Sequence, residues 1–345
     1  MNSQIVLLFG GASEEYDVSL ASAASVLRAL DSHRWSVCPI GISKEGRWYL
    51  SPADPDRIES DGWLDQTARA GEVIPAPSGF LGRDGRRILP AAVLPVMHGR
   101  IGEDGRVQGL FDTLSIPYVG CGCAASAVAM DKALTKALAA SLDVPTVPYL
   151  TVCRGELTEP HLTERITDTL GLPLFVKPCT SGSSLGASEV HTAEELFPSL
   201  ASALCHSDTA LVERLVRARE CEVALLDTPS LSLCHVGEVE TGGRFYDYRT
   251  KYECPSVGLS TNPALPCGVA DRMQDYAWRV FRALGGRHLA RLDFFYDEHD
   301  GQIYLSEINT MPGFTAISMY PKLMMEGGMT HFELISGLIE LALNK

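Results

Sequence analysis

The sequence predicts a mixed α/β and α+β protein of two or three lobes that share one cleft, beginning with a small doubly wound α/β lobe. Three observations lead to this fold class. A strand–helix–strand pattern opens the chain, a Gly/Ser loop follows an apolar strand near the middle, and a hairpin with regularly spaced acidic residues lies near the C-terminus. At 345 residues, the chain also exceeds what one hydrophobic core usually serves.

The first lobe is expected from residue 1 to about residue 124. The apolar run at 5–10 is typical of a buried parallel strand, and a second such run lies at 37–42. Between them, apolar residues recur at helical spacing, namely Ala23, Val26, Leu27 and Leu30. Strand-like runs at 91–96 and 117–120 extend this βαβ opening into a doubly wound lobe.

The second lobe is expected over residues 125–214. A helix follows Lys132, and the strand LPLFVKP leads into the Gly/Ser loop at 181–186. A capping box at 192–195 then begins another helix, and the apolar run at 210–215 predicts a strand. These elements indicate a separate α+β lobe.

The third lobe is expected over residues 215–345. Its predicted strands lie near 221–226 and 234–240, and a polar loop from about 245 to 266 follows them. A helix near 271–284, a hairpin at 289–308 and a final helix that begins at the capping box Thr330–Glu333 complete the prediction.

Composition narrows the function classes. With 46% hydrophobic and 21% charged residues the chain should fold, and its net charge of −14, without any long Lys/Arg block, argues against nucleic acid as a partner. No apolar run is long enough to span a bilayer, and no basic signal region precedes the first strand. The ten cysteines are scattered, several of them in apolar runs (Cys38, Cys205, Cys234), and are expected to be buried reduced thiols. We therefore expect a cytoplasmic protein that does not contact membranes.

The hairpin at 289–308 carries the strongest chemical signal. Arg291 and Asp293 lie two residues apart on one strand, and Glu307 and Asn309 lie two apart on the next, so each pair shares a face. Oxygen ligands grouped in this way suit Mg²⁺, which also bridges nucleotide phosphates. A solvated sheet face with incidental ion pairs is the alternative interpretation.

Lys177 ends the strand LPLFV directly before the loop Ser181–Gly186. Small residues allow backbone N–H groups to approach phosphate oxygens, so the combination is typical of a phosphate-binding lid. It is neither a Walker A loop nor a GxGxxG fingerprint, and an ordinary turn is the alternative.

Two further acidic groups have candidate roles. Glu213 and Glu220 could accept hydrogen bonds from an adenine amine and ribose hydroxyls, although alone they would be read as surface carboxylates. The turn GGASEEYDVS, which contains Glu15, follows the first strand at the place where α/β sheets bind ligands. Its carboxylates either cap the helix or attract a cation, and a substrate that bears an ammonium group fits them.

Together these segments resemble the D-alanine–D-alanine ligase family, over nearly the full length and in family order. The matching stretches are GGASEEYDVS, PVMHGRIGEDGRVQGLFD, PYVGCG, MDKALTK, LPLFVKP with SGSSLG, FYDYRTKY, ARLDFF and SEINTMPGFTAISMYPKL. The resemblance implies a three-lobed ATP-grasp architecture in which ATP is held between the second and third lobes.

The resemblance also implies a role for each matching residue. Lys132, Lys177 and Ser184 would bind the nucleotide phosphates, Glu213 and Glu220 the adenosine, and Asp293, Glu307 and Asn309 two Mg²⁺ ions, which Mn²⁺ could replace. Glu15 would hold the ammonium of the first D-alanine near His98, with Ser183 and Tyr252 closing the loops and Lys251 contacting the transferring phosphoryl group. Ser318 and Met319 would receive the second D-alanine, and Arg291 with the N–H of Gly313 would form the oxyanion site.

The implied activity is the ATP-dependent joining of two D-alanines through a D-alanyl phosphate, for peptidoglycan precursor synthesis, by a cytoplasmic homodimer. Two departures from the family pattern stand out. RAR replaces a glycine-containing turn before Glu220, and Met319 follows Ser318 where the family often has Leu. Tyr252 and Met319 favour an amine acceptor with a small apolar side chain.

Three alternatives stay open. D-serine could be the acceptor, because an apolar pocket rejects one hydroxyl only weakly. Another ATP-grasp carboxylate–amine ligase would share the lysines and the acidic set, but not FYDYRTKY or the first turn. A non-catalytic nucleotide-binding regulator would be expected to have lost a metal ligand or Arg291, and none of these is missing.

Overall fold

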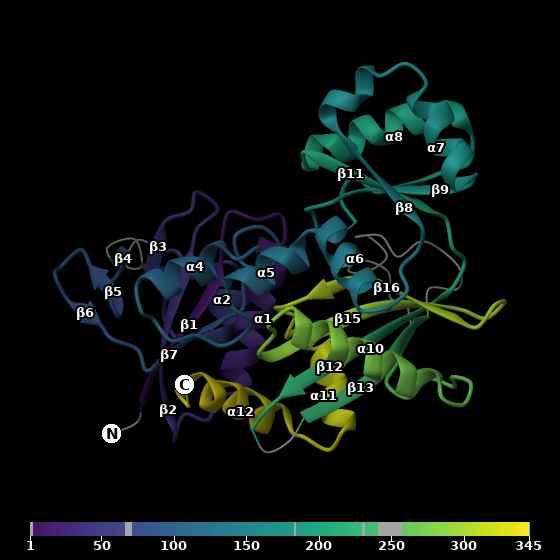
Figure 1. The fold of residues 1–345 in the computed structure, drawn as a ribbon. Coiled ribbons are helices and arrows are strands. Elements are labelled where there is room, and N and C mark those ends of the chain that lie inside the picture. The colour runs from purple at the N-terminus through teal and green to yellow at the C-terminus, as the bar shows by residue number, and fades with distance from the viewer. Residues whose placement is uncertain (1–2, 66–70, 183, 230–231, 241–257, 345) are drawn as a thin grey trace.

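The computed structural model describes residues 3–65, 71–182, 184–229, 232–240 and 258–344. Figure 1 shows three lobes, with the N-terminal lobe in purple and blue beside two others that lie one above the other. The predicted α/β and α+β class and the three-lobed architecture are confirmed. Among the described residues, no helix is long and apolar enough to cross a membrane.

The first lobe contains a largely parallel sheet in the order β3-β2-β1-β7. Strands β1 (Ser3–Gly10), β2 (Trp35–Ile42) and β7 (Ala92–Pro95) run parallel, and β3 (Trp48–Leu50) pairs antiparallel at the edge. The helices of this lobe are α1 (Tyr16–Ala29), α2 (Pro55–Glu59) and α4 (Arg106–Thr113). The run at 117–120, predicted as a strand, makes only an isolated bridge between Tyr118 and Val93, because the chain turns away at once.

A small antiparallel sheet at the far end of this lobe has the order β4-β5-β6. Its strands are β4 (Val73–Ala76), β5 (Gly79–Gly82) and β6 (Arg87–Ile88). Phe80 and Ile88 of this sheet pack into the core beneath the main sheet. Figure 1 shows the small sheet at the end of the first lobe that is farthest from the other two lobes.

The central lobe has an antiparallel sheet in the order β10-β9-β11-β8. The strands are β8 (Tyr149–Cys153), β9 (Leu174–Pro178), β10 (Ser188–Val190) and β11 (Thr209–Arg214). A short 3-10 helix η1 (Arg154–Thr158) and helices α7 (Leu162–Leu170) and α8 (Ala193–His206) complete the lobe. The helices pack against one face of this sheet and form the core of the lobe with it (Figure 1). The opposite face is therefore available to line a cavity.

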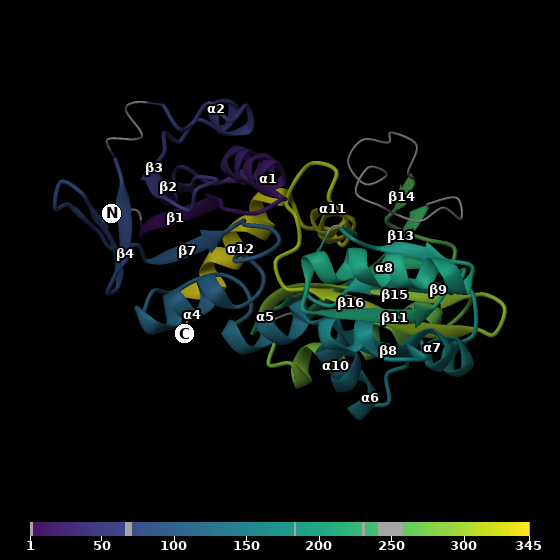
Figure 2. The same cartoon turned by 90° about the horizontal axis from the view of Figure 1, so that it is seen from above.

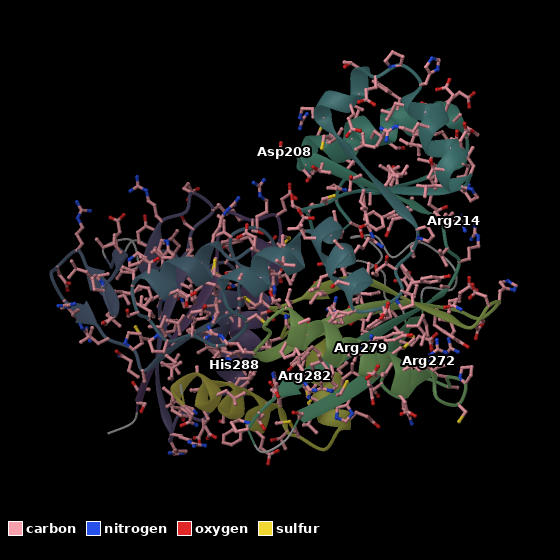
Figure 3. All side chains as sticks on the ribbon, in the orientation of Figure 1. Asp208, Arg214, Arg272, Arg279, Arg282 and His288 are labelled. Atoms are coloured by element: carbon pink, nitrogen blue, oxygen red, sulfur yellow. The ribbon has the colours of Figure 1, made fainter. Side chains whose placement is uncertain are left out.

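The third lobe has an antiparallel sheet in the order β14-β13-β12-β15-β16. The strands are β12 (Arg219–Asp227), β13 (Ser232–Glu240), β14 (Gly258–Ser260), β15 (His288–Asp297) and β16 (Gln302–Asn309). Helices α10 (Val269–Ala283), α11 (Met319–Glu326) and α12 (His331–Leu343) accompany it. Figure 3 labels three arginines of α10, Arg272, Arg279 and Arg282, whereas Met273, Ala277 and Phe281 bury the opposite face of that helix.

Two of the hydrophobic cores contain residues from more than one of the predicted lobes. Helices α5 (Cys123–Met130) and α6 (Lys132–Ser141) pack in one core with β12, β15 and β16, although the predicted boundary between residues 124 and 125 cuts α5 and places α6 in the second lobe. Helix α12 packs beside α1 and β7 of the first lobe, and Figure 2 shows it there in yellow. An amphipathic pattern indicates that a helix has an apolar face but does not identify the surface that covers it.

The described cysteines are free thiols, but they are not uniformly buried as predicted. Cys121, Cys179 and Cys221 are buried, whereas Cys205 is exposed. The apolar run around Cys205 is one face of α8, where Leu196, Leu200, Ala203 and Leu204 point inward. Cys205 falls on the other side of the helix, so the prediction for this residue is wrong.

Candidate active site

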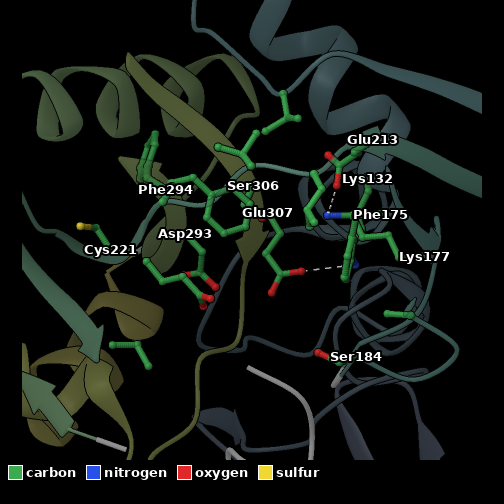
Figure 4. Close-up of a pocket in the computed structure, with 18 of the residues that line it drawn as sticks. Lys132, Phe175, Lys177, Ser184, Glu213, Cys221, Asp293, Phe294, Ser306 and Glu307 are labelled. Atoms are coloured by element: carbon green, nitrogen blue, oxygen red, sulfur yellow. Dashed lines mark ion pairs between the residues drawn. The ribbon is translucent and has the colours of Figure 1, made fainter. Parts of the chain in front are cut away.

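A cavity of about 590 Å³ lies between the sheet of the central lobe and the sheet of the third lobe. Figure 4 shows Lys132, Lys177 and Glu213 together on one side, and Asp293 and Glu307 toward the other. Of the predicted site residues, those that line this cavity are Lys132, Lys177, Ser184, Glu213, Glu220, Arg291, Asp293 and Glu307. Apolar side chains also line it, among them Phe175, Leu215, Val216 and Phe295.

Lys132 begins α6 and reaches the mouth of the Gly/Ser loop. The side chain of Asp131 caps this helix by accepting hydrogen bonds from two backbone N–H groups of the first turn. The Lys132 ammonium donates to the carbonyl of Ser181 at 2.7 Å and lies 3.3 Å from Glu307 Oε2. The structure thus brings one predicted phosphate ligand beside both the loop and a predicted metal ligand (Figure 4).

Lys177 and Glu213 face each other across neighbouring strands β9 and β11. Lys177 Nζ lies 2.7 Å from Glu213 Oε2, and Lys136 Nζ of α6 lies 2.6 Å from Glu213 Oε1. Burial by itself would raise the pKa of Glu213, but the charges of Lys177 and Lys136 outweigh it and lower this pKa below its ordinary value. The Glu213 carboxylate therefore stays ionised between two ammonium groups.

Sequence reasoning missed Lys136. Its spacing of four residues from Lys132 places both lysines on one face of α6, which is the signal that could have identified it. What the spacing could not show is that Lys136 would be completely buried against β11.

Glu220 lies at the start of β12, on the carboxylate wall of the cavity. Burial, followed by the negative charges of Asp293, Glu222 and Glu307, raises the pKa of Glu220 to about 7. Crowded carboxylates with a raised pKa indicate an environment that would favour a cation or a hydrogen-bond donor.

Arg291 is buried and holds two carboxylates. Its Nε and Nη2 donate to the two oxygens of Asp293, each at 2.7 Å, and its Nε lies 3.0 Å from Glu222 Oε2. Although burial opposes the charge, Asp293 and Glu222 raise the pKa of the guanidinium. Sequence reasoning missed Glu222, which occurs two residues after Glu220 and therefore on the same face of the strand.

The predicted metal ligands meet where the hairpin strands pair. Asp293 lies opposite Glu307 in the register, which shifts between Asp293 and Phe294, and Asn309 Nδ2 donates to Asp293 Oδ2 at 3.0 Å. Within the described part of the chain, no group of three or more His, Cys, Asp or Glu side chains is arranged to hold a metal ion. Two carboxylates and an amide at the edge of this cavity nevertheless fit Mg²⁺, which takes most of its other ligands from water and phosphate.

The turn of the first lobe reaches the Gly/Ser loop. Ser13 Oγ donates to the carbonyl of His98 at 2.8 Å, and its hydroxyl accepts from the backbone N–H of Glu15 at 3.2 Å. A Cβ placed on Gly182 would lie 3.2 Å from Glu15 Oε2. The carboxylate of Glu15 therefore lies against the Gly/Ser loop, which carries the nucleotide-binding candidate Ser184.

His98 is buried and joins the first lobe to the loop after β16. Its Nε2 lies 2.9 Å from Ser22 Oγ, and this hydroxyl accepts from the backbone N–H of Phe314 at 3.4 Å. Its Nδ1 lies 3.5 Å from Glu103, whose pKa is raised mainly by burial and also by the charge of Glu15. Sequence reasoning missed Ser22 and Glu103, although Glu103 lies within the matching stretch that contains His98.

Gly313 and Ser318 lie on the loop that leads into α11, and Met319 is the first residue of that helix. A Cβ on Gly313 would lie 2.7 Å from Ser318 Oγ, which pairs with Thr315 Oγ1 at 2.7 Å. Met319 is buried, and its sulfur would meet a Cβ on Gly237 of β13 at 2.8 Å. None of these residues, nor Glu15, His98 or Asn309, lines the cavity described above, whereas Ser183, Lys251 and Tyr252 lie outside the described residues.

Comparisons with known proteins agree with this geometry. The family model described as the D-Ala D-Ala ligase N-terminus matches residues 4–121, and the one described as the C-terminus matches residues 138–340. The chain is 40% identical to a D-alanine–D-alanine ligase from Deinococcus radiodurans, with all of both chains covered. It is 39% identical to one from Enterococcus faecalis, with 99% of each chain covered.

Solved structures give the same result. The D-Ala:D-Ser ligase VanG from Enterococcus faecalis matches with a TM-score of 0.89 and 32% identity over 99% of this chain and 100% of that one. The D-alanine-D-alanine ligase from Coxiella burnetii matches with a TM-score of 0.84 and 30% identity over 99% of this chain and 96% of that one. With both halves matched by family models, the chain belongs to the D-alanine–D-alanine ligase family.

Proposed function

We propose that this enzyme uses ATP to join two D-alanines into D-alanyl-D-alanine, releasing ADP and phosphate, for the synthesis of peptidoglycan precursors. The observation that carries the proposal is that one cavity is lined both by the lysines Lys132 and Lys177 and by the carboxylates Asp293 and Glu307. A carboxylate is a poor acyl donor at neutral pH. Phosphorylation by ATP converts it into an acyl phosphate with a good leaving group.

The chain's own residues supply binding and electrostatics. Lys132 and Lys177 neutralise the nucleotide phosphates, and Ser184 with the rest of the Gly/Ser loop covers them. Phe175, Leu215 and Val216 offer apolar contacts to the base, while Glu213 and Glu220 accept hydrogen bonds from the adenosine. Lys251 contacts the transferring phosphoryl group.

Asp293, Glu307 and Asn309 hold two Mg²⁺ ions, and Mn²⁺ can replace them. When bound, these ions neutralise charge on the phosphates during transfer. The support is the pairing of Asp293 with Glu307 in the sheet register, together with the raised pKa of Glu220, which burial and then the neighbouring carboxylates cause. For Asp293 to bind a cation, it must give up part of its contact with Arg291.

Two subsites receive the amino acids. Glu15 anchors the ammonium of the first D-alanine near His98, and Ser183 with Tyr252 closes the loops over it so that water is excluded. The amine of the second D-alanine, which lies beside Ser318 and Met319, attacks the acyl carbon and displaces phosphate. Arg291 and the N–H of Gly313 stabilise the tetrahedral oxyanion that forms in this step.

D-serine as the second substrate is the alternative that one observation favours, since the chain is similar to a D-Ala:D-Ser ligase of known structure. Met319 argues for D-alanine, because its thioether is only a weak hydrogen-bond acceptor for a serine hydroxyl. We further propose that the enzyme is a cytoplasmic homodimer. The free thiols support the cytoplasmic location, and family membership supports both statements. Sedimentation of the purified protein tests the dimer.

The function is tested by phosphate release from ATP and Mg²⁺, with products identified by mass. D-alanine alone should support release and yield the dipeptide, whereas L-alanine alone should not. If D-alanine with D-serine gives mainly the mixed dipeptide, the acceptor assignment to Met319 fails. If no D-amino acid stimulates release, the ligase activity itself is refuted.

A further inference from the structure

Lys136 has no role in the proposed chemistry, yet it is one of the largest completely buried side chains among the described residues. Its ammonium lies 2.6 Å from Glu213 Oε1 and 3.5 Å from the carbonyl of Val147, and it faces the ring of Tyr149 at 5.2 Å. Lys136 does not line the cavity, so it cannot be a direct ligand for the substrate in this arrangement.

The three charged groups form an unbalanced cluster. Glu213 supplies one negative charge, while Lys136 and Lys177 supply two positive charges, one at each carboxylate oxygen. The cluster therefore carries a net positive charge, and Lys177 is the member that lines the cavity together with Glu213. Without Lys136, Lys177 and Glu213 would form a neutral pair, and the cavity would lose this positive charge.

We propose that Lys136 is a positioning residue for nucleotide binding. It neutralises the charge of Glu213 at the carboxylate oxygen that Lys177 does not contact, and the ammonium of Lys177 therefore stays available to the phosphates. The proposal rests on the nucleotide-binding role given above to Lys177. It assigns Glu213 a second role, as the carboxylate that couples the two lysines, in addition to any hydrogen bond that it accepts from the adenosine.

The protonation of each group depends on the others. Burial lowers the pKa of Lys136, whereas Glu213 raises it and Lys177 lowers it further, so the carboxylate is the group that favours the charged form of Lys136. In the opposite sense, the two lysines lower the pKa of Glu213 despite its burial. Buried charges are costly to retain when apolar residues of similar volume would fit, and a functional requirement for the extra positive charge explains why the cluster is not apolar.

The first test is Lys136→Met, measured as the affinity for ADP with Mg²⁺ by calorimetry. Methionine keeps much of the volume and leaves Glu213 paired with Lys177, so no buried charge is left unpaired and the variant should fold. The dissociation constant for ADP should rise about tenfold, as expected when one positive charge near the phosphates is neutralised. The KM for D-alanine should change less than twofold. An unchanged affinity for ADP in the folded variant would overturn the proposal.

A second variant separates charge from structure. In Lys136→Met combined with Glu213→Gln, Lys177 again has no counter-ion, and the amide oxygen of Gln can still accept a hydrogen bond. Because Glu213 itself belongs to the nucleotide site, the double variant is compared with Glu213→Gln alone. In that background Lys136→Met should weaken ADP binding by less than about threefold, against about tenfold in the wild-type background, because no carboxylate charge is left for Lys136 to neutralise. A tenfold loss in both backgrounds would show that Lys136 does not act through the charge of Glu213 and would overturn the proposal. If Lys136→Met alone does not fold, the comparison of the double variant with Glu213→Gln still tests the proposal.

Lys177→Met is the matched control for the underlying function. It should weaken ADP binding at least as much as Lys136→Met. If Lys177→Met leaves the affinity unchanged, the assignment of the nucleotide site fails, and the role of Lys136 falls with it. If only Lys136→Met has no effect, the nucleotide site stands and the positioning role alone is wrong.

Discussion

Replacing Arg291 with methionine should separate nucleotide binding from catalysis. The guanidinium makes two 2.7 Å hydrogen bonds to Asp293 and a 3.0 Å contact with Glu222, and only 8% of the residue is exposed. Loss of one well-placed donor to an oxyanion costs about 3–4 kcal/mol, or roughly 10²–10³ in kcat. Binding of ADP with Mg²⁺ should stay within about threefold of the wild type, because Lys132 and Lys177 are untouched.

The same substitution has a structural cost that must be measured separately. Removing the cation leaves the carboxylates of Asp293 and Glu222, which lie opposite each other across β12 and β15, without the guanidinium charge that offsets their repulsion. Loss of one member of a buried ion pair costs about 3–5 kcal/mol, and the cost here should lie at or below that range because Asp293 is only partly buried. Denaturant unfolding at several Mg²⁺ concentrations should show this loss and its partial recovery when Mg²⁺ screens the carboxylates. Arg291→Lys is the control, since it keeps the charge but not the bidentate geometry.

Turnover is measured as dipeptide formation with saturating ATP and D-alanine, at a temperature where each variant is folded. We expect the kcat of Arg291→Met to fall by at least 10² and that of Arg291→Lys to fall less. A folded Arg291→Met variant whose kcat stays within about threefold of the wild type would refute the role of Arg291 at the oxyanion. A simultaneous loss of ADP binding would show that Arg291 acts on the nucleotide instead.

Gly313→Ala should raise the KM for the second D-alanine by about tenfold, because the new Cβ would lie 2.7 Å from Ser318 Oγ and displace this hydroxyl. An unchanged KM in steady-state kinetics would show that Ser318 does not contact the second D-alanine. The lowered pKa of Glu213 means that its charged form stabilises the fold above the unfolded value of about 4.3, and that this contribution is lost as the pH falls. The difference in unfolding free energy between the wild type and Glu213→Gln should thus shrink below about pH 4, and a difference that grows there would contradict the ion cluster. A thiol reagent should label the exposed Cys205 in the native protein and spare the buried Cys121. Burial raises the pKa of the Cys121 thiol to about 11, which also makes it less reactive. If mass mapping finds Cys121 labelled and Cys205 spared, the assignment of buried and exposed positions is wrong.

The sequence predicts an element best where a single periodicity of its side chains determines the type of element. The alternation in the hairpin placed Arg291 with Asp293 and Glu307 with Asn309 on common faces, and β15 and β16 confirm the hairpin. The register shift after Asp293 could not be predicted, because a bulge leaves the alternation on either side intact.

Long-range packing sets the limit of what the sequence reveals. Lys136 is recognisable as a neighbour of Lys132 on one helix face, but its burial against Glu213 depends on where α6 docks relative to β11. In the same way, the contact between Ser22 and Phe314 joins residues almost three hundred positions apart. No local pattern encodes such a contact. The sequence therefore indicated candidate residues, part of which line one cavity, but it could not indicate the ion pairs among them.

The most direct test of the central claim follows the oxygen atoms of the first substrate. D-alanine labelled with ¹⁸O in its carboxylate is incubated with the enzyme, ATP and Mg²⁺, and the released phosphate is analysed by mass. If the carboxylate attacks the γ-phosphorus and the amine then displaces phosphate, each dipeptide formed transfers one ¹⁸O to phosphate. Formation of D-alanyl-D-alanine with unlabelled phosphate would contradict the acyl phosphate and the roles that we assign around it.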